Sequence, residues 1–276
     1  MRLGLMQGRL LPPVDGAIQC FPGSPWPEEF RIAASLGLDF IEWIVDQAPG
    51  NPLAGDTDVP LVRSAMVETG VVVSSVCADV FMGELQLAHG SPSSQGTAAA
   101  RLTSLLHTTA AVGGTRIVLP FVDSSALEQS ADLDAARRAI EGVLPTAKAQ
   151  GVELHLETSL DPSSFAAFLE QVPDTMVKVN YDMGNSAALG YRPADEFAAY
   201  GHRIGSVHVK DRVRGGSTVA PGSGSTDFEA VFAGLKALGY DGDYVLQVAR
   251  GADGDEVGTI RHSIDFVRQH LAAIAD

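Results

Sequence analysis

The sequence predicts a single (β/α)8 barrel domain that spans residues 1–276. Strand-like and helix-like segments alternate along the chain, eight of each can be recognised, and glycine or proline separates them. Strict alternation implies parallel strands that are connected by helical crossovers. Eight such units in 276 residues fit a closed barrel, a fold that typically takes about 250 residues.

The expected strands are short runs rich in β-branched and apolar residues, and the expected helices are longer amphipathic runs rich in Ala and Leu. In chain order, the strands are predicted at residues 3–7, 40–44, 71–77, 116–120, 152–157, 177–182, 204–210 and 244–248. The helices are predicted at residues 27–36, 60–69, 96–112, 126–149, 162–171, 193–200, 227–238 and 255–275.

Residues at the segment boundaries support these assignments. Several predicted helices begin with proline, whose missing N–H has no partner in the first helical turn. Glycine, which favours the left-handed conformation at helix C-termini, follows five of the helical runs. A dinucleotide-binding sheet would need G-x-G-x-x-G after the first strand, and the sequence there is MQGRL. An open Rossmann sheet is therefore disfavoured.

Composition excludes several classes of function. The net charge of −15 argues against nucleic-acid binding, which needs a Lys/Arg surface. No apolar run approaches the ~18 residues of a membrane helix, so no membrane association is expected. The two cysteines, Cys20 and Cys77, are too far apart for a C-x-x-C motif, which argues against a structural zinc site or a disulfide framework. We expect a cytoplasmic protein that acts on a small molecule, either alone or as a homo-oligomer.

Two predicted strand-to-helix loops are longer than the usual ~4–6 residues. They cover residues 8–25 after the first strand and residues 45–59 after the second. Active sites of (β/α)8 barrels lie on the face formed by these loops, so we expect both loops to shape a pocket.

Polar side chains occur at the ends of four consecutive strands. Glu157 ends strand 5, Asp182 ends strand 6, His208 lies on strand 7 and Gln247 on strand 8. Because side chains alternate along a strand, their apolar neighbours face the helices and the polar set faces the barrel axis. Carboxylate oxygen with imidazole nitrogen is a ligand set for one divalent ion such as Mn, Co, Mg or Zn. The sequence therefore predicts a metal site with these four residues.

The motifs on these strands resemble the xylose-isomerase-like superfamily of sugar and sugar-phosphate isomerases and epimerases. The matching segments are LHLE at residues 154–157, NYDMGN at 180–185, VHVKD at 207–211 and PGSGSTDF at 221–228. The resemblance covers the whole chain in order and spacing. It implies Glu157, Asp182 and His208 as metal ligands, with strand 8 supplying the fourth.

The sequence departs from this family at two positions. Strand 8 carries Gln247 where the family usually has glutamate, and Asn185 stands where many members have histidine. A glutamine carbonyl can bind a hard metal, but it cannot accept a proton as a carboxylate does. Family epimerases resemble two-base enzymes, so Gln247 weakens the epimerase interpretation and leaves Glu157 as the obvious base.

Further residues near the predicted mouth are candidates for substrate binding. Arg9, Lys210, Arg212 and Arg214 could hold a phosphate or carboxylate group.

Glu42 could bind sugar hydroxyls with Trp43 as a stacking wall, although core packing also explains Trp43 and is the favoured interpretation. Asn185 and Asp211 lie at the same face and are also predicted to contact the substrate.

The leading hypothesis is a metal-dependent isomerase or epimerase-like enzyme that acts on a sugar or sugar-phosphate hydroxy-ketone through an enediolate. Glu157 would move the proton and Lys210 would stabilise the developing oxyanion. Gln247 keeps open a lyase, dehydratase or hydrolase on the same scaffold, or a non-catalytic sugar-binding barrel. An apurinic endonuclease, which shares the fold, is disfavoured by the negative charge.

Overall fold

The computed structural model describes residues 1–55 and 58–273. Eight parallel strands form a closed barrel in the order β1-β10-β7-β6-β5-β4-β3-β2, which confirms the predicted (β/α)8 fold. The barrel strands are β1 (Leu3–Met6), β2 (Phe40–Ile44), β3 (Val72–Cys77), β4 (Arg116–Phe121), β5 (Glu153–Thr158), β6 (Val177–Asp182), β7 (Ile204–Val209) and β10 (Asp243–Leu246).

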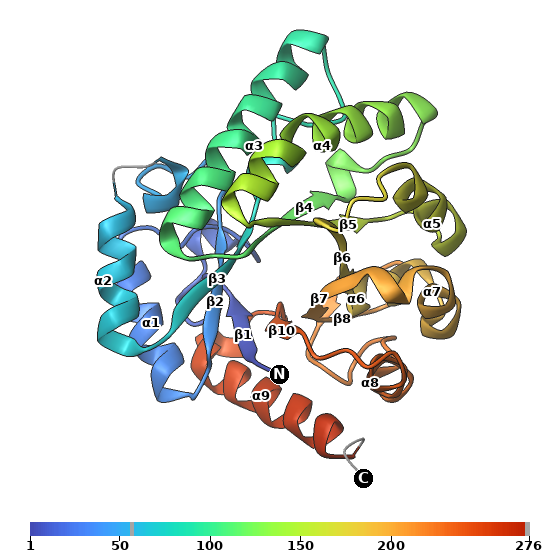
Figure 1. The fold of residues 1–276 in the computed structure, drawn as a ribbon. Helices are drawn as coiled ribbons and strands as arrows, with labels where there is room; N and C mark the ends of the chain where they lie inside the picture. Colours follow the sequence, from blue (N-terminus) through green and yellow to red (C-terminus); the bar gives the residue numbers. More distant parts are fainter. Residues whose placement is uncertain (56–57, 274–276) are drawn as a thin grey trace.

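Helices surround the strands (Figure 1). They are α1 (Trp26–Ser35), α2 (Val59–Thr69), α3 (Pro92–Val112), α4 (Ser130–Gln150), α5 (Pro162–Gln171), α6 (Met183–Leu189), α7 (Pro193–Tyr200), α8 (Phe228–Ala237) and α9 (Glu256–Ala273). No described helix is long and apolar enough to cross a membrane. The last two residues of the final predicted helix, 274 and 275, lie outside the described residues, as do residues 56 and 57 of the second long loop.

Side-chain alternation divides the apolar residues into an inner and an outer set. On β5, Leu154 and Leu156 pack outward in the large core between barrel and helices. A second, smaller cluster with Met6, Phe40 and Val118 fills the inside of the barrel. The interior is therefore closed by packed side chains, and the polar residues at the strand ends lie at its mouth.

Two helices begin four residues away from their expected first residues. Helix α3 starts four residues early because Ser91 accepts a hydrogen bond from the Ser94 amide (3.2 Å). Helix α4 starts at Ser130, four residues later than predicted, because the Asp132 carboxylate accepts the Gln129 amide (2.9 Å). In both cases a side chain that caps the first turn sets the boundary.

Helix α6 and a small antiparallel ribbon were not predicted. Helix α6 follows β6 directly, and the Asp182 side chain caps it by accepting the Asn185 amide (2.8 Å). Its sequence, MGNSAAL, covers seven residues, which is shorter than the window of about 11–18 residues in which helical periodicity can be recognised. Strands β8 (Asp211–Arg212) and β9 (Thr218–Val219) pair as the ribbon after β7. Both features lie at the barrel mouth.

Candidate functional site

Three of the four predicted metal ligands meet at the mouth of the barrel. Glu157, Asp182 and His208 come from the neighbouring strands β5, β6 and β7, and all three are buried. One ligand atom from each lies within 4.8 Å of the other two. Two carboxylates and an imidazole at this separation can enclose a single divalent cation.

A hydrogen bond from across the barrel fixes the orientation of His208. Its Nε2 lies 2.6 Å from Oε1 of Glu42 on β2, and the hydroxyl of Ser75 donates to Oε2 of Glu42 (2.6 Å). Nδ1 of His208 therefore points the other way, at 3.3 Å from Glu157 and 3.9 Å from Asp182. A carboxylate–histidine pair of this kind holds the second nitrogen in place for a metal ion.

The free nitrogen of His208 is the strongest sign that the residues fit a metal ion. Nδ1 is buried and makes no hydrogen bond to any described residue. A buried polar atom without a partner is costly, and a cation between this nitrogen and the two carboxylates removes that cost. The donor set and its geometry therefore suit a divalent ion.

The protein without a metal ion balances these charges by protonation. Burial alone would lower the pKa of His208, but the charges of Glu42 and Glu157 raise that pKa to about 10. Burial would likewise raise the pKa of Glu157, and contact with His208 outweighs burial and lowers it. An imidazolium between two carboxylates therefore occupies the place where a cation would neutralise the same charges.

Amide side chains hold the Glu157 carboxylate in a fixed position. Asn180 donates to its Oε2 (2.9 Å) and Asn185 donates to its Oε1 (2.7 Å). Asn185 is in turn held by Arg212, whose Nη1 donates to Oδ1 (2.9 Å). The lack of a side chain at Gly184 lets α6 pack directly against Lys210 at the end of β7, because a Cβ there would lie 2.7 Å from Cγ of Lys210.

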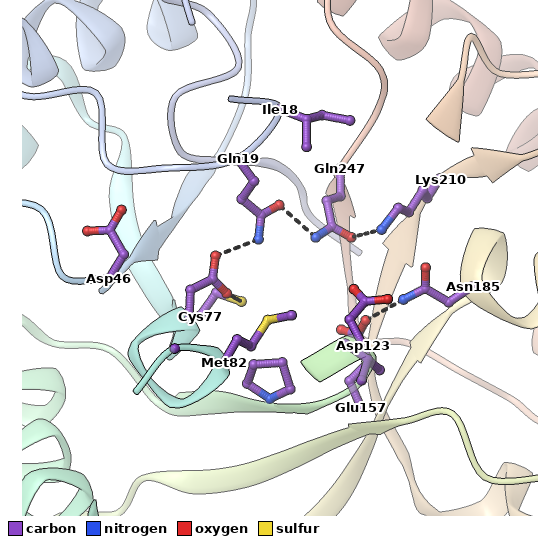
Figure 2. Close-up of a pocket in the computed structure, with 14 residues that line it drawn as sticks. Ile18, Gln19, Asp46, Cys77, Met82, Asp123, Glu157, Asn185, Lys210 and Gln247 are labelled. Carbon is purple, nitrogen blue, oxygen red and sulfur yellow. Dashed lines mark hydrogen bonds between the residues drawn. The ribbon is translucent and has the colours of Figure 1, made fainter. Parts of the chain in front are cut away.

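A chain of hydrogen bonds crosses the mouth beside these ligands (Figure 2). Nζ of Lys210 lies 3.3 Å from Asp182 and 3.4 Å from Oε1 of Gln247. Nε2 of Gln247 donates to Gln19 (2.8 Å), and Gln19 donates to Asp79 (2.8 Å). The Gln247 carbonyl thus faces an ammonium group, and its place as a fourth metal ligand stays a prediction.

A pocket of about 420 Å³ opens above the ligands. This volume lies in the range of small-molecule sites. Its described lining residues come from the ends of all eight barrel strands and the segments that follow them, and comprise Ile18, Gln19, Asp46, Cys77, Asp79, Met82, Gly83, Pro120, Val122, Asp123, Glu157, Asn185, Lys210 and Gln247. Both long loops contribute, through Gln19 and Asp46.

The structure does not support the substrate contacts expected for Glu42 and Trp43. Glu42 is fully buried and its oxygens are engaged by His208 and Ser75. The Trp43 ring is also fully buried, and its Nε1 donates to Asn51 (2.9 Å). Side chains alternate across the sheet, so Glu42 faces the barrel interior while Trp43 packs outward among aromatic residues of the β1–α1 region.

Two more predicted substrate contacts have structural partners instead. Arg9 is buried and donates to the carbonyls of Val248 (3.0 Å) and Ile18, which fastens the first long loop. The Asp211 carboxylate is buried and accepts the amides of Gly224 (2.7 Å) and Thr226, which fixes the loop after the ribbon.

Arg212 and Arg214 do not line the pocket either. Arg212 donates twice to the carbonyl of Gly216, at 3.1 and 2.8 Å, and so closes the turn of the ribbon. Its remaining contact, to Asn185, connects it to the site indirectly. Lys210 and Asn185, by contrast, both line the pocket, and their roles stay predictions.

Several pocket residues were not foreseen from the sequence. Asp79 and Asp123 each follow a barrel strand by two residues, in the short helices η3 (Asp79–Met82) and η4 (Asp123–Ser125). Extending the search for polar strand ends to strands 3 and 4 would have found both. Gln19 lies in the middle of a long loop, where no periodicity indicates which side chain turns inward.

Comparisons with known proteins place the chain in a family. A family model described as xylose isomerase-like TIM barrel matches residues 30–270. The chain therefore belongs to the xylose isomerase-like TIM-barrel family, and the predicted resemblance is confirmed. L-ribulose-5-phosphate 3-epimerase UlaE of Shigella flexneri serotype 5b is 27% identical over 264 residues, which cover 91% of each chain. The UlaE protein of Escherichia coli strain SE11 is also 27% identical, with the same coverage.

Solved structures share the fold at lower identity. 3-keto-D-glucoside 4-epimerase YcjR from E. coli superposes with a TM-score of 0.74 at 22% identity, covering 98% of this chain and 99% of its own. An L-ribulose 3-epimerase has a TM-score of 0.78 at 17% identity, covering 99% and 95%. The IOLI protein, solved with a zinc atom, has a TM-score of 0.79 at 16% identity, covering 98% and 99%. The prediction of an enzyme of this family is confirmed, with the reaction unspecified.

Proposed function

We propose that the protein is a metal-dependent sugar isomerase or epimerase that moves a proton at a carbon next to a carbonyl group. The observation that carries this proposal is the buried Nδ1 of His208, which makes no hydrogen bond to a described residue and is directed between Glu157 and Asp182 at the floor of the pocket. The names of the sequence relatives support the reaction class, because each is an epimerase of a keto-sugar phosphate.

Glu157, Asp182 and His208 would hold the ion, and Gln247 is the candidate for a fourth ligand. When bound, a divalent ion supplies Lewis-acid stabilisation of the negative charge that develops on the substrate oxygens. The set contains no thiolate, so it suits Mn, Co, Mg or Zn.

Glu157 is the proposed base. It is ionised at neutral pH, because its contact with His208 lowers the pKa of the carboxyl despite burial. It takes the proton from the substrate carbon, and the electron pair left behind forms the enediolate. Asn180 and Asn185 hold both oxygens, so the carboxylate needs little reorganisation when it accepts the proton.

Lys210 is placed to stabilise the oxygen that becomes negative. Its ammonium group has three donors, and two of them face Asp182 and Gln247 at 3.3 and 3.4 Å. A third is available for a substrate oxygen, at the side of the pocket that also holds Glu157. A donor aimed at developing charge lowers the barrier to enolisation.

Gln247 determines how the proton returns. Glutamine cannot donate a proton to the opposite face of the enediolate as a carboxylic acid can. Return by Glu157 to the neighbouring carbon gives aldose–ketose isomerisation, whereas epimerisation needs a donor on the other face. Asp79 lines the pocket, and burial raises its pKa to about 6, so it is the candidate for that second donor.

The variant Glu157→Gln tests the base directly. We expect loss of solvent-deuterium incorporation into keto-sugars by about 100-fold or more, with the fold retained. Glu153→Gln is the matched control, because Glu153 lies on the same face of β5 but pairs with His155 and Lys178 below the pocket. Equal exchange rates in wild type and Glu157→Gln would remove Glu157 from the mechanism.

A lyase or dehydratase is the second candidate, because Gln247 replaces a proton-transfer group. The mass of the product distinguishes isomerisation or epimerisation from dehydration. Isomerisation or epimerisation conserves the mass of the sugar apart from deuterium, whereas dehydration lowers it by one water. Metal-independent sugar binding without exchange would indicate the non-catalytic barrel.

A further inference from the structure

The pocket is strongly acidic. Among its described lining residues, four carry carboxylates, which are Asp46, Asp79, Asp123 and Glu157, and Lys210 is the one cation. The Lys210 ammonium already contacts Asp182 at 3.3 Å. A phosphate ester would bring close to two more negative charges into this space, where the one lining cation is already shared with Asp182 and Gln247.

Three arginines around the mouth, Arg9, Arg250 and Arg212, are engaged with the backbone of nearby loops. Arg9 donates to the carbonyls of Ile18 and Val248. Arg250 donates to the carbonyls of Gly8, Leu11 and Ile18, so both guanidinium groups fasten the same loop to the end of the barrel.

Arg212 closes the ribbon turn through the carbonyl of Gly216. None of these three arginines is among the described residues that line the pocket. To grip a phosphate, any of them would have to release the backbone groups that keep its loop folded.

Two carboxylates at the mouth, Asp46 and Asp123, face the pocket. Asp46 accepts the amides of Phe21 (2.8 Å) and Ala48 (3.0 Å), which fixes its orientation toward the pocket. Asp123 is exposed, and its carboxylate makes no hydrogen bond or ion pair within the described part of the chain. In Figure 2, Asp46 lies on one side of the pocket, and Asp123 lies on the other beside Glu157 and Asn185.

The backbone of Asp123 supports a role at this position. Its φ of 50° lies in the left-handed region, which few residues other than glycine adopt. Such backbone conformations cluster at ligand sites, where the side chain must face a given direction. An acceptor without a partner at the edge of a pocket suits a hydroxyl donor on a ligand.

We propose that the substrate is an unphosphorylated, uncharged polyhydroxy ketone or aldehyde, and that Asp46 and Asp123 exclude phosphate esters by their charge. This inference rests on the proposed enolisation at Glu157. The Asp123 carboxylate, and the lone pairs that Asp46 keeps besides its two backbone contacts, offer acceptors that match sugar hydroxyls. The sequence relatives are named for a sugar 5-phosphate, so this chain differs from them in substrate class.

The experiment compares each free sugar with its own phosphate ester. Metal-loaded wild-type protein is incubated in deuterated water with L-ribulose, D-fructose, D-psicose and D-tagatose, and with the phosphate of each. We expect kcat/KM for solvent-deuterium incorporation to be at least about 100-fold higher for the best free sugar than for its ester. Added salt should narrow this ratio, because it screens charge repulsion.

Variants identify the source of the discrimination. Asp123→Asn together with Asp46→Asn should raise kcat/KM for the ester about tenfold relative to the free sugar. Asn tolerates the left-handed conformation at residue 123, so the fold should persist. Asp265→Asn, an exposed residue on α9, is the control for net charge and should leave the ratio unchanged.

Three outcomes are distinguishable. Preference for free sugars that shrinks in the Asp46/Asp123 variant supports the inference. Equal or faster exchange with the esters overturns it and leaves the proposed function standing. Exchange with neither form of any sugar overturns the proposed function, and this inference with it.

Discussion

The two sides of the barrel mouth use similar residues for different purposes. On the side of β5, β6 and β7, Glu157, Asp182 and His208 direct oxygen and nitrogen atoms toward one point below the pocket. On the side of β1 and β2, the buried carboxylates Glu29 and Glu42 each bind groups of the protein itself. A charged side chain at the barrel mouth therefore either holds part of the fold or directs its atoms toward the pocket, depending on what it faces.

Substitution of the buried Glu29, on the β1 and β2 side of the mouth, should have the largest effect on the free energy of unfolding. Its carboxylate accepts the amides of Gly8 (2.9 Å) and Leu10 (3.2 Å) and so anchors the first long loop. Burial raises its pKa from 4.5 to about 7. Folding therefore favours the protonated form, and its contribution to stability is full below pH 4.5 and is lost as the pH rises to about 7.

The variant Glu29→Gln removes this titration. Between pH 4.5 and pH 8, the stability of wild type relative to the variant should fall by about 3 kcal/mol, which corresponds to the pKa shift. Urea unfolding at a series of pH values measures the difference. Parallel stability curves for the two proteins would show that Glu29 does not titrate in this range.

Glu42 connects the two sides, and its variant should affect the metal site without changing the pocket. Glu42→Gln keeps the shape but weakens the contact with Nε2 of His208. We expect the affinity for Mn²⁺ to fall about 10- to 100-fold, as for other groups that orient metal ligands. Calorimetric titration of the metal-free protein measures it. Unchanged Mn²⁺ affinity would show that Glu42 does not support metal binding by His208.

A substitution at Trp43 should have the smallest effect, and only the free energy of unfolding should change. Trp43→Phe removes the hydrogen bond to Asn51 and some packing, so the free energy of unfolding should fall by about 1–2 kcal/mol. KM for the sugar should stay the same, because the ring packs away from the pocket against Phe21 and Trp26. A raised KM with unchanged stability would restore the stacking role that the sequence suggested.

The fold and the three central ligands could be predicted because each depends on local patterns. Alternation along a strand places Glu157 opposite Leu156, and the order of strands brings Glu157, Asp182 and His208 to adjacent strand ends. These relations involve neighbouring strands only. These relations hold even when the predicted boundaries of the strands are wrong by a few residues.

The partners of Glu42 and Arg9 could not be predicted, because they depend on closure of the barrel. Glu42 and His208 are 166 positions apart in the sequence and meet through the barrel interior, not along a strand pair. Arg9 and Val248 are 239 apart and meet where the first and last strands join. Sequence patterns identify a charged residue near the mouth, but not the group with which it forms a hydrogen bond or ion pair.

The metal content of the purified protein tests the central claim most directly. After incubation with Mn²⁺ and dialysis, wild type and a His107→Ala control, altered at an exposed position on α3, should each hold about one ion per chain, and His208→Ala should hold none. Wild-type protein without metal, or equal content in His208→Ala, would contradict a metal site formed by Glu157, Asp182 and His208.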